Sequence, residues 1–292
     1  MDTEKIKIKM KKILPKKIYL IGLRLWRTLA PIIYRSNLKK LRKFDRPFYK
    51  KVNVKGKEFY LLIDPKNGLF DKTIYLSDAY EEETTNLILS KINKDDVFLD
   101  IGSNIGYFSN LLPQYCKKVI AFEPIKRAYS QNKKSIEKNG YKNIELHNVA
   151  CGRASGKGTI NINNKNLGGS SLIKEKLIED GRRLGETESV EIIGIDNFLK
   201  NKKLKIGFVK IDTEGFEWEV LQGMEELLKR DKPKMVVEFL PTLHNKINPE
   251  IPKRMIRFLE NIGYKIYDMK ARRNIDSNMK FNEDCDLYCV IK

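Results

Sequence analysis

Residues 97–107 of this chain read VFLDIGSNIGY. The apolar and β-branched residues at 97–99 predict a buried strand, and the two glycines that follow, Gly102 and Gly106, predict a turn that leads into a helix. Glycine allows the backbone of such a turn to approach a ligand where a side chain would collide. The stretch therefore predicts a strand–turn–helix unit with a ligand-binding turn, although a glycine pair alone also fits a plain turn.

A second apolar run, VIAFEP at 119–124, ends in the acid Glu123, about twenty residues after Asp100. In a parallel sheet this spacing puts a carboxylate at the tip of the neighbouring strand, where it can accept hydrogen bonds from both hydroxyls of a ribose. The turn lacks the G-x-G-x-x-G pattern that favours the pyrophosphate of a dinucleotide. A nucleoside cofactor without phosphates fits better, and S-adenosylmethionine is such a cofactor.

Positive charge is concentrated at the start of the chain. Residues 1–57 contain 19 Lys and Arg against 3 acidic residues, so most of the formal net charge of +19 belongs to a basic arm. Within this arm, residues 18–34 predict an amphipathic helix that Arg24 and Arg27 make too polar to span a membrane. Two interpretations stay open: peripheral contact of residues 1–45 with an anionic membrane on its cytoplasmic face, or packing of the helix on the body. Contact with nucleic acid is disfavoured because the body is nearly neutral.

The rest of the chain predicts one α/β domain. Strands and helices that alternate from residue 97 to residue 260 predict a mostly parallel, Rossmann-like sheet. We expect a domain at 51–292 after an arm at 1–50, with an inserted loop region at 152–190 that contains short antiparallel strands at 159–162 and 190–193. Further expected features are a β-hairpin at 51–64, a helix opened by Asp78 with Glu81 as its capping-box partner, helices at 127–138, 216–229 and 250–260, and an antiparallel hairpin of 264–269 with 287–291 at the sheet edge.

The cysteines and histidines do not match a metal centre. Four cysteines form no C-x-x-C pair, and only His147 and His244 could add imidazole ligands, so the spacing of a structural zinc site is missing. Reduced thiols are typical of a cytoplasmic protein.

A second motif, KIDTEGFE at 210–217, places charge at the end of an otherwise apolar strand. Ligands of open α/β sheets bind at the carboxyl ends of the strands, so Asp212 and Glu214 are expected beside Gly102 and Glu123. The alternative is that Asp212 caps a helix whose first turn is enriched in acids.

Taken together, these motifs resemble the FkbM-type methyltransferases over roughly Glu82 to Lys270. The resemblance implies a Rossmann-like, S-adenosylmethionine-dependent enzyme that methylates hydroxyls on sugars, glycans and natural products. It implies active-site positions for Asp212 and Glu214. It also implies cofactor contacts at Asp100, Gly102, Asn104, Gly106, Glu123 and Asn148. Ser103 replaces a frequent Ala and Thr213 a common Val, and neither change removes a needed group.

For such a transfer, Asp212 or Glu214 could take the proton of the acceptor hydroxyl. Alternatively, the pair could hold a divalent ion together with Glu238. His244 is a second candidate base, with an exposed loop histidine as the alternative, and residues 168–171 form either a closing loop or a plain surface loop. The competing functions are an RNA methyltransferase guided by the arm and a membrane-associated binding protein without catalysis.

Overall fold

The computed structural model describes residues 46–66, 69–77, 80–163, 167–173 and 186–291. Residues 1–45 of the arm predicted at 1–50 and the predicted cap residue Asp78 lie outside these ranges, and residues 48–50 belong to the first strand, β1 (Phe48–Val54). In the described part, none of the helices has both the length and the apolar character that crossing a membrane requires.

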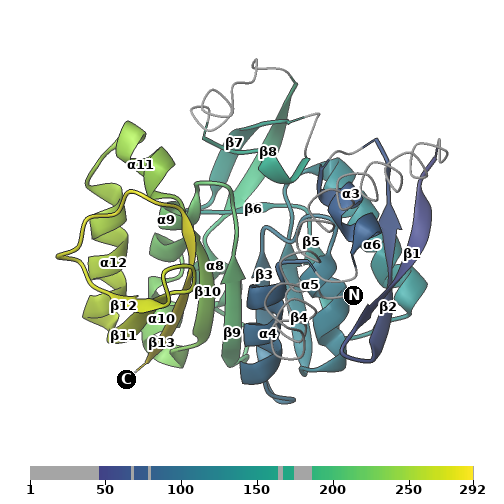
Figure 1. The fold of residues 1–292 in the computed structure, drawn as a ribbon, viewed down its shortest axis with the longest axis horizontal. Coiled ribbons are helices and arrows are strands. Elements are labelled where there is room, and N and C mark those ends of the chain that lie inside the picture. Colours follow the sequence, from purple (N-terminus) through teal and green to yellow (C-terminus); the bar gives the residue numbers. More distant parts are fainter. Residues whose placement is uncertain (1–45, 67–68, 78–79, 164–166, 174–185, 292) are drawn as a thin grey trace, which may run out of the picture.

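Within the described residues, eight strands form the central sheet in the order β12-β11-β13-β10-β9-β3-β4-β5 (Figure 1). Strands β10, β9, β3, β4 and β5 are parallel, and β13, β11 and β12 pair antiparallel. The α/β, Rossmann-like fold with antiparallel strands at its C-terminal end is thereby confirmed. The strands are β3 (Val97–Ile101), β4 (Lys118–Phe122), β5 (Ile144–His147), β9 (Ile206–Ile211), β10 (Lys234–Phe239), β11 (Tyr264–Asp268), β12 (Arg273–Ile275) and β13 (Cys285–Ile291).

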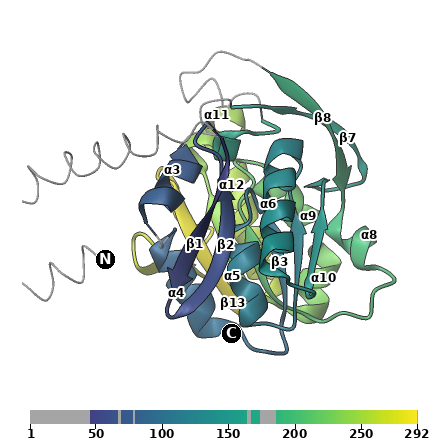
Figure 2. The ribbon, with the colours of Figure 1, turned by 90° about the vertical axis from the view of Figure 1, so that its right-hand side faces the viewer.

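Side chains of the central strands alternate between two buried apolar clusters, one on each face of the sheet. Leu99 and Val209 pack with residues of α8, α9, α10 and α12, whereas Phe98 and Phe208 pack with residues of α4, α5 and the β1–β2 hairpin. Figure 2 shows this hairpin beside α5 and α6. The helices are α3 (Leu69–Leu76), α4 (Glu82–Lys91), α5 (Tyr107–Leu111), α6 (Lys126–Asn139), α8 (Ile195–Leu199), α9 (Glu217–Gln222), α10 (Glu225–Asp231), α11 (Pro241–Ile247) and α12 (Ile251–Ile262).

The smaller β structures agree with the sequence. The expected hairpin is β1 (Phe48–Val54) paired with β2 (Lys57–Ile63). The inserted region contains β7 (Gly156–Asn161) antiparallel to β8 (Thr187–Ile193), and the short β6 (Ala150–Cys151) adds a third strand that the sequence did not predict.

Three expectations need correction. The helix predicted at 216–229 is two helices, α9 and α10, because the backbone leaves the helical conformation at Gly223, the C-cap of α9, and Met224, the N-cap of α10; Gly223 also packs against the carbonyl oxygen of Gly152, where no Cβ would fit. The closing hairpin is antiparallel, but β13 lies inside the sheet between β10 and β11, and β12 takes the rim. The capping-box prediction is wrong because α4 begins at Glu82 with Glu81 itself as the N-cap residue, not as the third residue of a helix opened at position 78.

Candidate functional site

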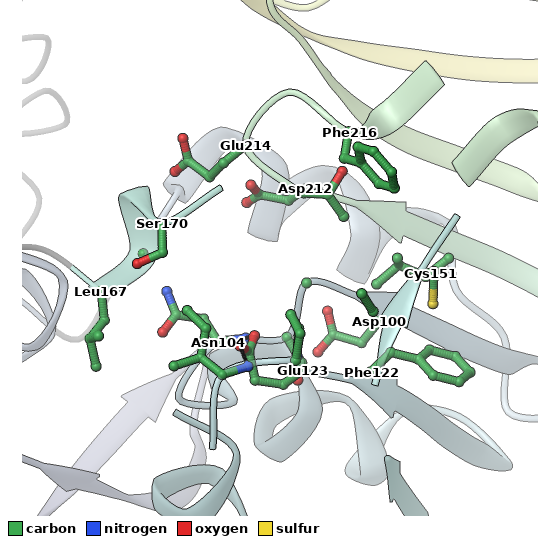
Figure 3. A pocket seen from close by; sticks show the side chains of 18 of the residues that line it. Asp100, Asn104, Phe122, Glu123, Cys151, Leu167, Ser170, Asp212, Glu214 and Phe216 are labelled. Carbon is green, nitrogen blue, oxygen red and sulfur yellow. Dashed lines mark hydrogen bonds between the residues drawn. The ribbon is translucent and has the colours of Figure 1, made fainter. Parts of the chain in front are cut away.

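The carboxyl ends of β3, β4 and β9 open onto one pocket (Figure 3). Asp100, Gly102, Asn104 and Glu123 line one part of it. Asp212 and Glu214, from the loop after β9, line the part opposite, which is also bordered by Ser170 of the inserted region. The two sequence motifs therefore meet at a single cavity.

The turn after β3 requires glycine at position 102. Gly102 has φ +84°, and a Cβ on it would collide with the backbone carbonyl oxygen of Asp212. The amides of Gly102 and Ser103 both donate to the carbonyl oxygen of Phe122 at 3.0 Å. This turn thus joins β4 to the loop that carries Asp212, and a side chain at position 102 would separate the two halves of the pocket.

Glu123 is held by main-chain amides. Its Oε2 accepts a hydrogen bond from the amide of Asn104 at 2.8 Å, and its Oε1 accepts one from the amide of Ile125 at 2.9 Å. Each carboxylate oxygen has a further lone pair that a ligand hydroxyl can use. Only 4% of Glu123 is exposed, and this burial raises its pKa to about 7. Asn104 adopts a left-handed conformation with φ +51°, which asparagine tolerates better than most residues.

Asp100 lines the pocket beside Glu123, and Gly106 is the N-cap residue of α5. The hydroxyl of Ser109 donates to Oδ2 of Asp100 at 2.5 Å, and burial raises the pKa of Asp100 to about 6. Gly106 has φ +90°, and a Cβ there would collide with the side-chain amide of Asn132. Asp100 lines the cavity, whereas Gly106 supports the turn and does not line the cavity that the described residues form.

Asn148 lies behind the pocket. Its Nδ2 donates to the carbonyl oxygens of Glu123 and Pro124, each at 2.9 Å, while Val149 and Ala150 provide the neighbouring lining. Asn148 therefore braces the turn that carries Glu123.

Lys210 is a buried cation in this site that the sequence analysis did not single out. Its Nζ lies 2.6 Å from Oδ2 of Asp212 and 3.5 Å from Oε2 of Glu81, and only 5% of the residue is exposed. Burial alone would lower the pKa of Lys210, but Asp212, Glu81 and Asp100 together raise it well above its ordinary value. Partial burial raises the pKa of Glu81 to about 7, opposed by Lys210. The sequence held one signal for this residue, because a lysine inside an otherwise apolar strand is seldom buried without a charged partner.

Glu217, which is fully buried, fixes the acidic loop, residues 212–215, through hydrogen bonds to its main chain. Its Oε1 accepts hydrogen bonds from the amide and the hydroxyl of Thr213, both at 2.9 Å, and from the amide of Gly215 at 3.0 Å. Helix α9 begins at Glu217 with Phe216 as its N-cap, so the interpretation of Asp212 as a helix cap is wrong. The loop that carries Asp212 and Glu214 is fixed by a carboxylate that sequence reasoning placed only in a first turn.

His244 lies in α11 and is 1% exposed, so the exposed-loop alternative is wrong. Its Nε2 is 3.0 Å from the carbonyl oxygen of Gly215 and 4.0 Å from Oε2 of Glu217. It does not line the pocket that the described residues form. The imidazole contacts the back of the acidic loop.

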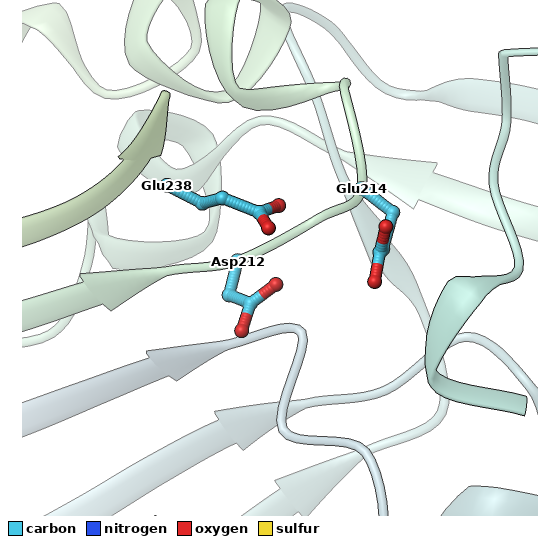
Figure 4. A group of neighbouring side chains, drawn as sticks. All are labelled: Asp212, Glu214 and Glu238. Atoms are coloured by element: carbon cyan, nitrogen blue, oxygen red, sulfur yellow. The ribbon is translucent and has the colours of Figure 1, made fainter. Parts of the chain in front are cut away.

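Two other expected features can be located. The first is the possible divalent-ion site. It consists of one carboxylate oxygen from each of Asp212, Glu214 and Glu238, and these oxygens lie within 4.8 Å of one another, a spacing that one divalent ion could bridge (Figure 4). In the inserted region, Gly168 and Ser170 line the pocket. The hydroxyl of Ser171 donates to the carbonyl oxygen of Glu214 at 2.7 Å, which joins this region to the acidic loop.

A mostly parallel sheet with a glycine turn after β3 and an acid after the adjacent β4, both at one pocket, defines a Rossmann-like α/β fold. A family model described as the methyltransferase FkbM domain matches residues 100–266. The chain belongs to this methyltransferase family, as its motifs suggested.

Similar proteins carry methyltransferase names. The chain is 27% identical over 150 residues to the hexuronic acid methyltransferase AglP of Haloferax volcanii, covering 51% of this chain and 58% of the relative. It is 23% identical over 172 residues to Methyltransferase 1 of Beauveria bassiana, covering 53% and 66%. The chain thus spans about three fifths to two thirds of the length of these relatives. Among solved structures, a methyltransferase FkbM from Methylobacillus flagellatus matches with a TM-score of 0.43 and 13% identity, covering 90% of this chain and 60% of that one.

Proposed function

We propose that this protein transfers a methyl group from S-adenosylmethionine to a hydroxyl of a sugar on a glycan, a glycolipid or a related metabolite. The observation that carries the proposal is that one pocket holds a ribose-type acid, Glu123, and a pair of acids, Asp212 and Glu214, on opposite sides. The first is suited to hold a nucleoside, and the second to handle a proton.

The residues present fit this cofactor. Glu123 has lone pairs for the two ribose hydroxyls, and the turn at 102–104 allows close approach of the ligand. Phe122 and Val149 offer apolar surface beside Glu123 for a purine. The cofactor supplies a methyl group on a positively charged sulfonium. When a nucleophile attacks the methyl carbon, the bond to sulfur breaks and the remainder of the cofactor leaves as a neutral thioether.

The protein's own contribution is alignment and removal of a proton. The acceptor oxygen must lie in line with the bond that breaks, and its hydroxyl proton must leave as the new C–O bond forms. In this proposal, Asp212 or Glu214 takes that proton. Oδ2 of Asp212 accepts a hydrogen bond from Lys210, which leaves Oδ1 as the oxygen that can take the proton.

The proposed acceptor class follows from the family resemblance and from one relative. A similar protein is named a hexuronic acid methyltransferase, which supports a sugar acceptor. Incubating the purified protein with methyl-labelled cofactor and separate pools of oligosaccharides, lipid-linked sugars and RNA tests the proposal. Label in a sugar pool supports it. Label in RNA alone favours the competing RNA methyltransferase, and cofactor binding without transfer to any pool favours a binding protein.

We further propose that residues 1–45 attach the enzyme to anionic membranes, because the arm combines the surplus charge with an amphipathic stretch. Each basic residue near an anionic surface contributes about 1 kcal/mol. We predict that the full chain co-sediments with anionic liposomes at low salt and dissociates at high salt, because exposed charges are screened. A chain lacking 1–45 should stay in the supernatant while it binds cofactor normally. Equal sedimentation of both chains would contradict this prediction.

A further inference from the structure

Glu81 occupies an unusual position at the start of α4. It has φ 42° and ψ 60°, a left-handed conformation that is uncommon for residues other than glycine. Its carbonyl oxygen accepts from the amide of Thr85 at 2.8 Å and so begins the helix, but its carboxylate makes no capping bond to a described residue. The carboxylate lies 3.5 Å from Nζ of Lys210. A strained backbone with its side chain directed at a buried charge points to a role in the site.

The partner of Glu81 stands at the centre of the sheet. Lys210 lies in β9, in register with Asp100 of β3 and with Val236 of β10. Its side chain alternates with Val209 and Ile211, so it faces the same side of the sheet as Phe208, the side covered by α4 and α5. Its Nζ lies 5.0 Å from the ring centroid of Phe108 in α5. A buried ammonium is stable only with well-placed carboxylates, and Asp212 and Glu81 are the two within ion-pair distance among the described residues.

We propose that Glu81 is a positioning residue for the proposed methyl transfer, acting through Lys210 to fix Asp212. The inference rests on the proposed function. Glu81 and Asp212 share one ammonium, so Lys210 is held from two directions and in turn holds Asp212 through Oδ2, which leaves Oδ1 for the hydroxyl proton. Without the charge of Glu81, Nζ of Lys210 would lose its second carboxylate partner and could shift. All of its positive charge would then stabilise the carboxylate of Asp212, which would make Asp212 a poorer acceptor of the hydroxyl proton.

Neighbouring contacts fix the segment that carries Glu81. Tyr80 lines the pocket, and the hydroxyl of Thr84 donates to Oδ2 of Asp286 in β13 at 3.1 Å. The first turn of α4 is therefore tied to the sheet beyond β10, while Tyr80, next to Glu81, lines the same pocket as Asp212. An anchored segment is what a positioning role needs, since small displacements in an active site reduce turnover strongly.

The test compares Glu81→Gln with Glu82→Gln, an exposed residue one position further along. With the acceptor found by labelling and at pH 8, we expect Glu81→Gln to lower kcat about 10-fold to 100-fold. The KM for the acceptor and the Kd for S-adenosylmethionine should stay within about three-fold of wild type, a split that general unfolding does not produce. Glu81→Asp should restore part of kcat, and Glu82→Gln should match wild type. A kcat for Glu81→Gln within two-fold of wild type would overturn the proposal.

Crystal structures of the wild type and of Glu81→Gln separate this inference from the proposed function, because they need no acceptor. If no acceptor is ever methylated, the proposed function fails by itself. A displaced Lys210 or a turned Asp212 carboxylate in Glu81→Gln would still support the positioning role. Unchanged positions of both side chains would overturn it.

Discussion

The two sides of the pocket, the cofactor side around Glu123 and the acceptor side around Asp212, are held in place by different kinds of contact. On the cofactor side, Glu123 is held by the amides of Asn104 and Ile125, all within one strand–turn–helix–strand unit. On the acceptor side, Asp212 is held by Lys210, and Lys210 by Glu81 from a segment more than a hundred residues away. Main-chain amides hold the first side, and charged side chains hold the second.

This difference governs how each side responds to substitution. A main-chain amide remains whatever side chain its residue carries, so the geometry around Glu123 survives most changes except at the glycines. A network of side-chain charges loses a partner with every substitution, and the remaining charges stay buried. We therefore expect the largest effects on turnover from the acceptor side, and effects on affinity from the cofactor side.

The largest effect is expected from Asp212→Asn. The amide keeps the shape of the side chain but cannot take up the hydroxyl proton, and it removes the negative charge that pairs with Lys210. We predict that kcat falls about 100-fold to 10,000-fold, as for other losses of a proton acceptor. Calorimetry should show an affinity for S-adenosylmethionine close to wild type. Activity within a few-fold of wild type would leave Glu214 as the proton acceptor.

The next effect is expected at Glu217, which holds the acidic loop without lining the pocket. Glu217→Ala leaves the amides of Thr213 and Gly215 unpaired, and we predict a loss of about 1–3 kcal/mol in the free energy of unfolding together with lower kcat. Glu217→Gln keeps an accepting oxygen and should lose less of both. Chemical denaturation and steady-state kinetics on the two variants measure this order. Equal losses would mean that the negative charge of Glu217, and not its hydrogen bonds, matters.

On the cofactor side, Glu123→Ala is expected to weaken binding of S-adenosylmethionine. The ribose hydroxyls would lose their acceptors, at a cost of about 1–3 kcal/mol, or roughly one to two decades in Kd. Turnover at saturating cofactor should change much less than in Asp212→Asn. Unchanged affinity by calorimetry would show that Glu123 does not hold the ribose.

The same contrast explains what the sequence could predict. The strands predicted at 97–100 and 119–123, which end in Asp100 and Glu123, follow from local periodicity and spacing; they correspond to β3 and β4, and both acids line the pocket. The positions of β13 and of Gly223 against Gly152 depend on contacts between distant segments, so local patterns did not reveal them.

The candidate site shows the same limit. Asp212 and Glu214 were predicted and line the pocket. Lys210, Glu81 and Glu217 were missed because their roles exist only after folding brings them together, and Glu81 had a plausible local role as a cap. The family resemblance implied a cofactor contact at Asn148, and local reasoning made His244 a candidate base, whereas both side chains contact main chain behind the lining.

The smallest effect is a pH dependence of stability from Glu123. Its pKa in the folded protein is about 7, above the ordinary value of 4.5, so between these values the folded protein binds more protons than the unfolded chain. The free energy of unfolding without cofactor should therefore fall as the pH rises from 5 to 8, by at most about 1.4 kcal/mol per pH unit for this group. Glu123→Gln removes the titration, so urea denaturation at pH 5.5 and at pH 8 should show a smaller difference in the variant than in the wild type. An equal difference in both proteins would mean that the two amides hold Glu123 as a carboxylate throughout, and that the cofactor side is as fully charged as the acceptor side.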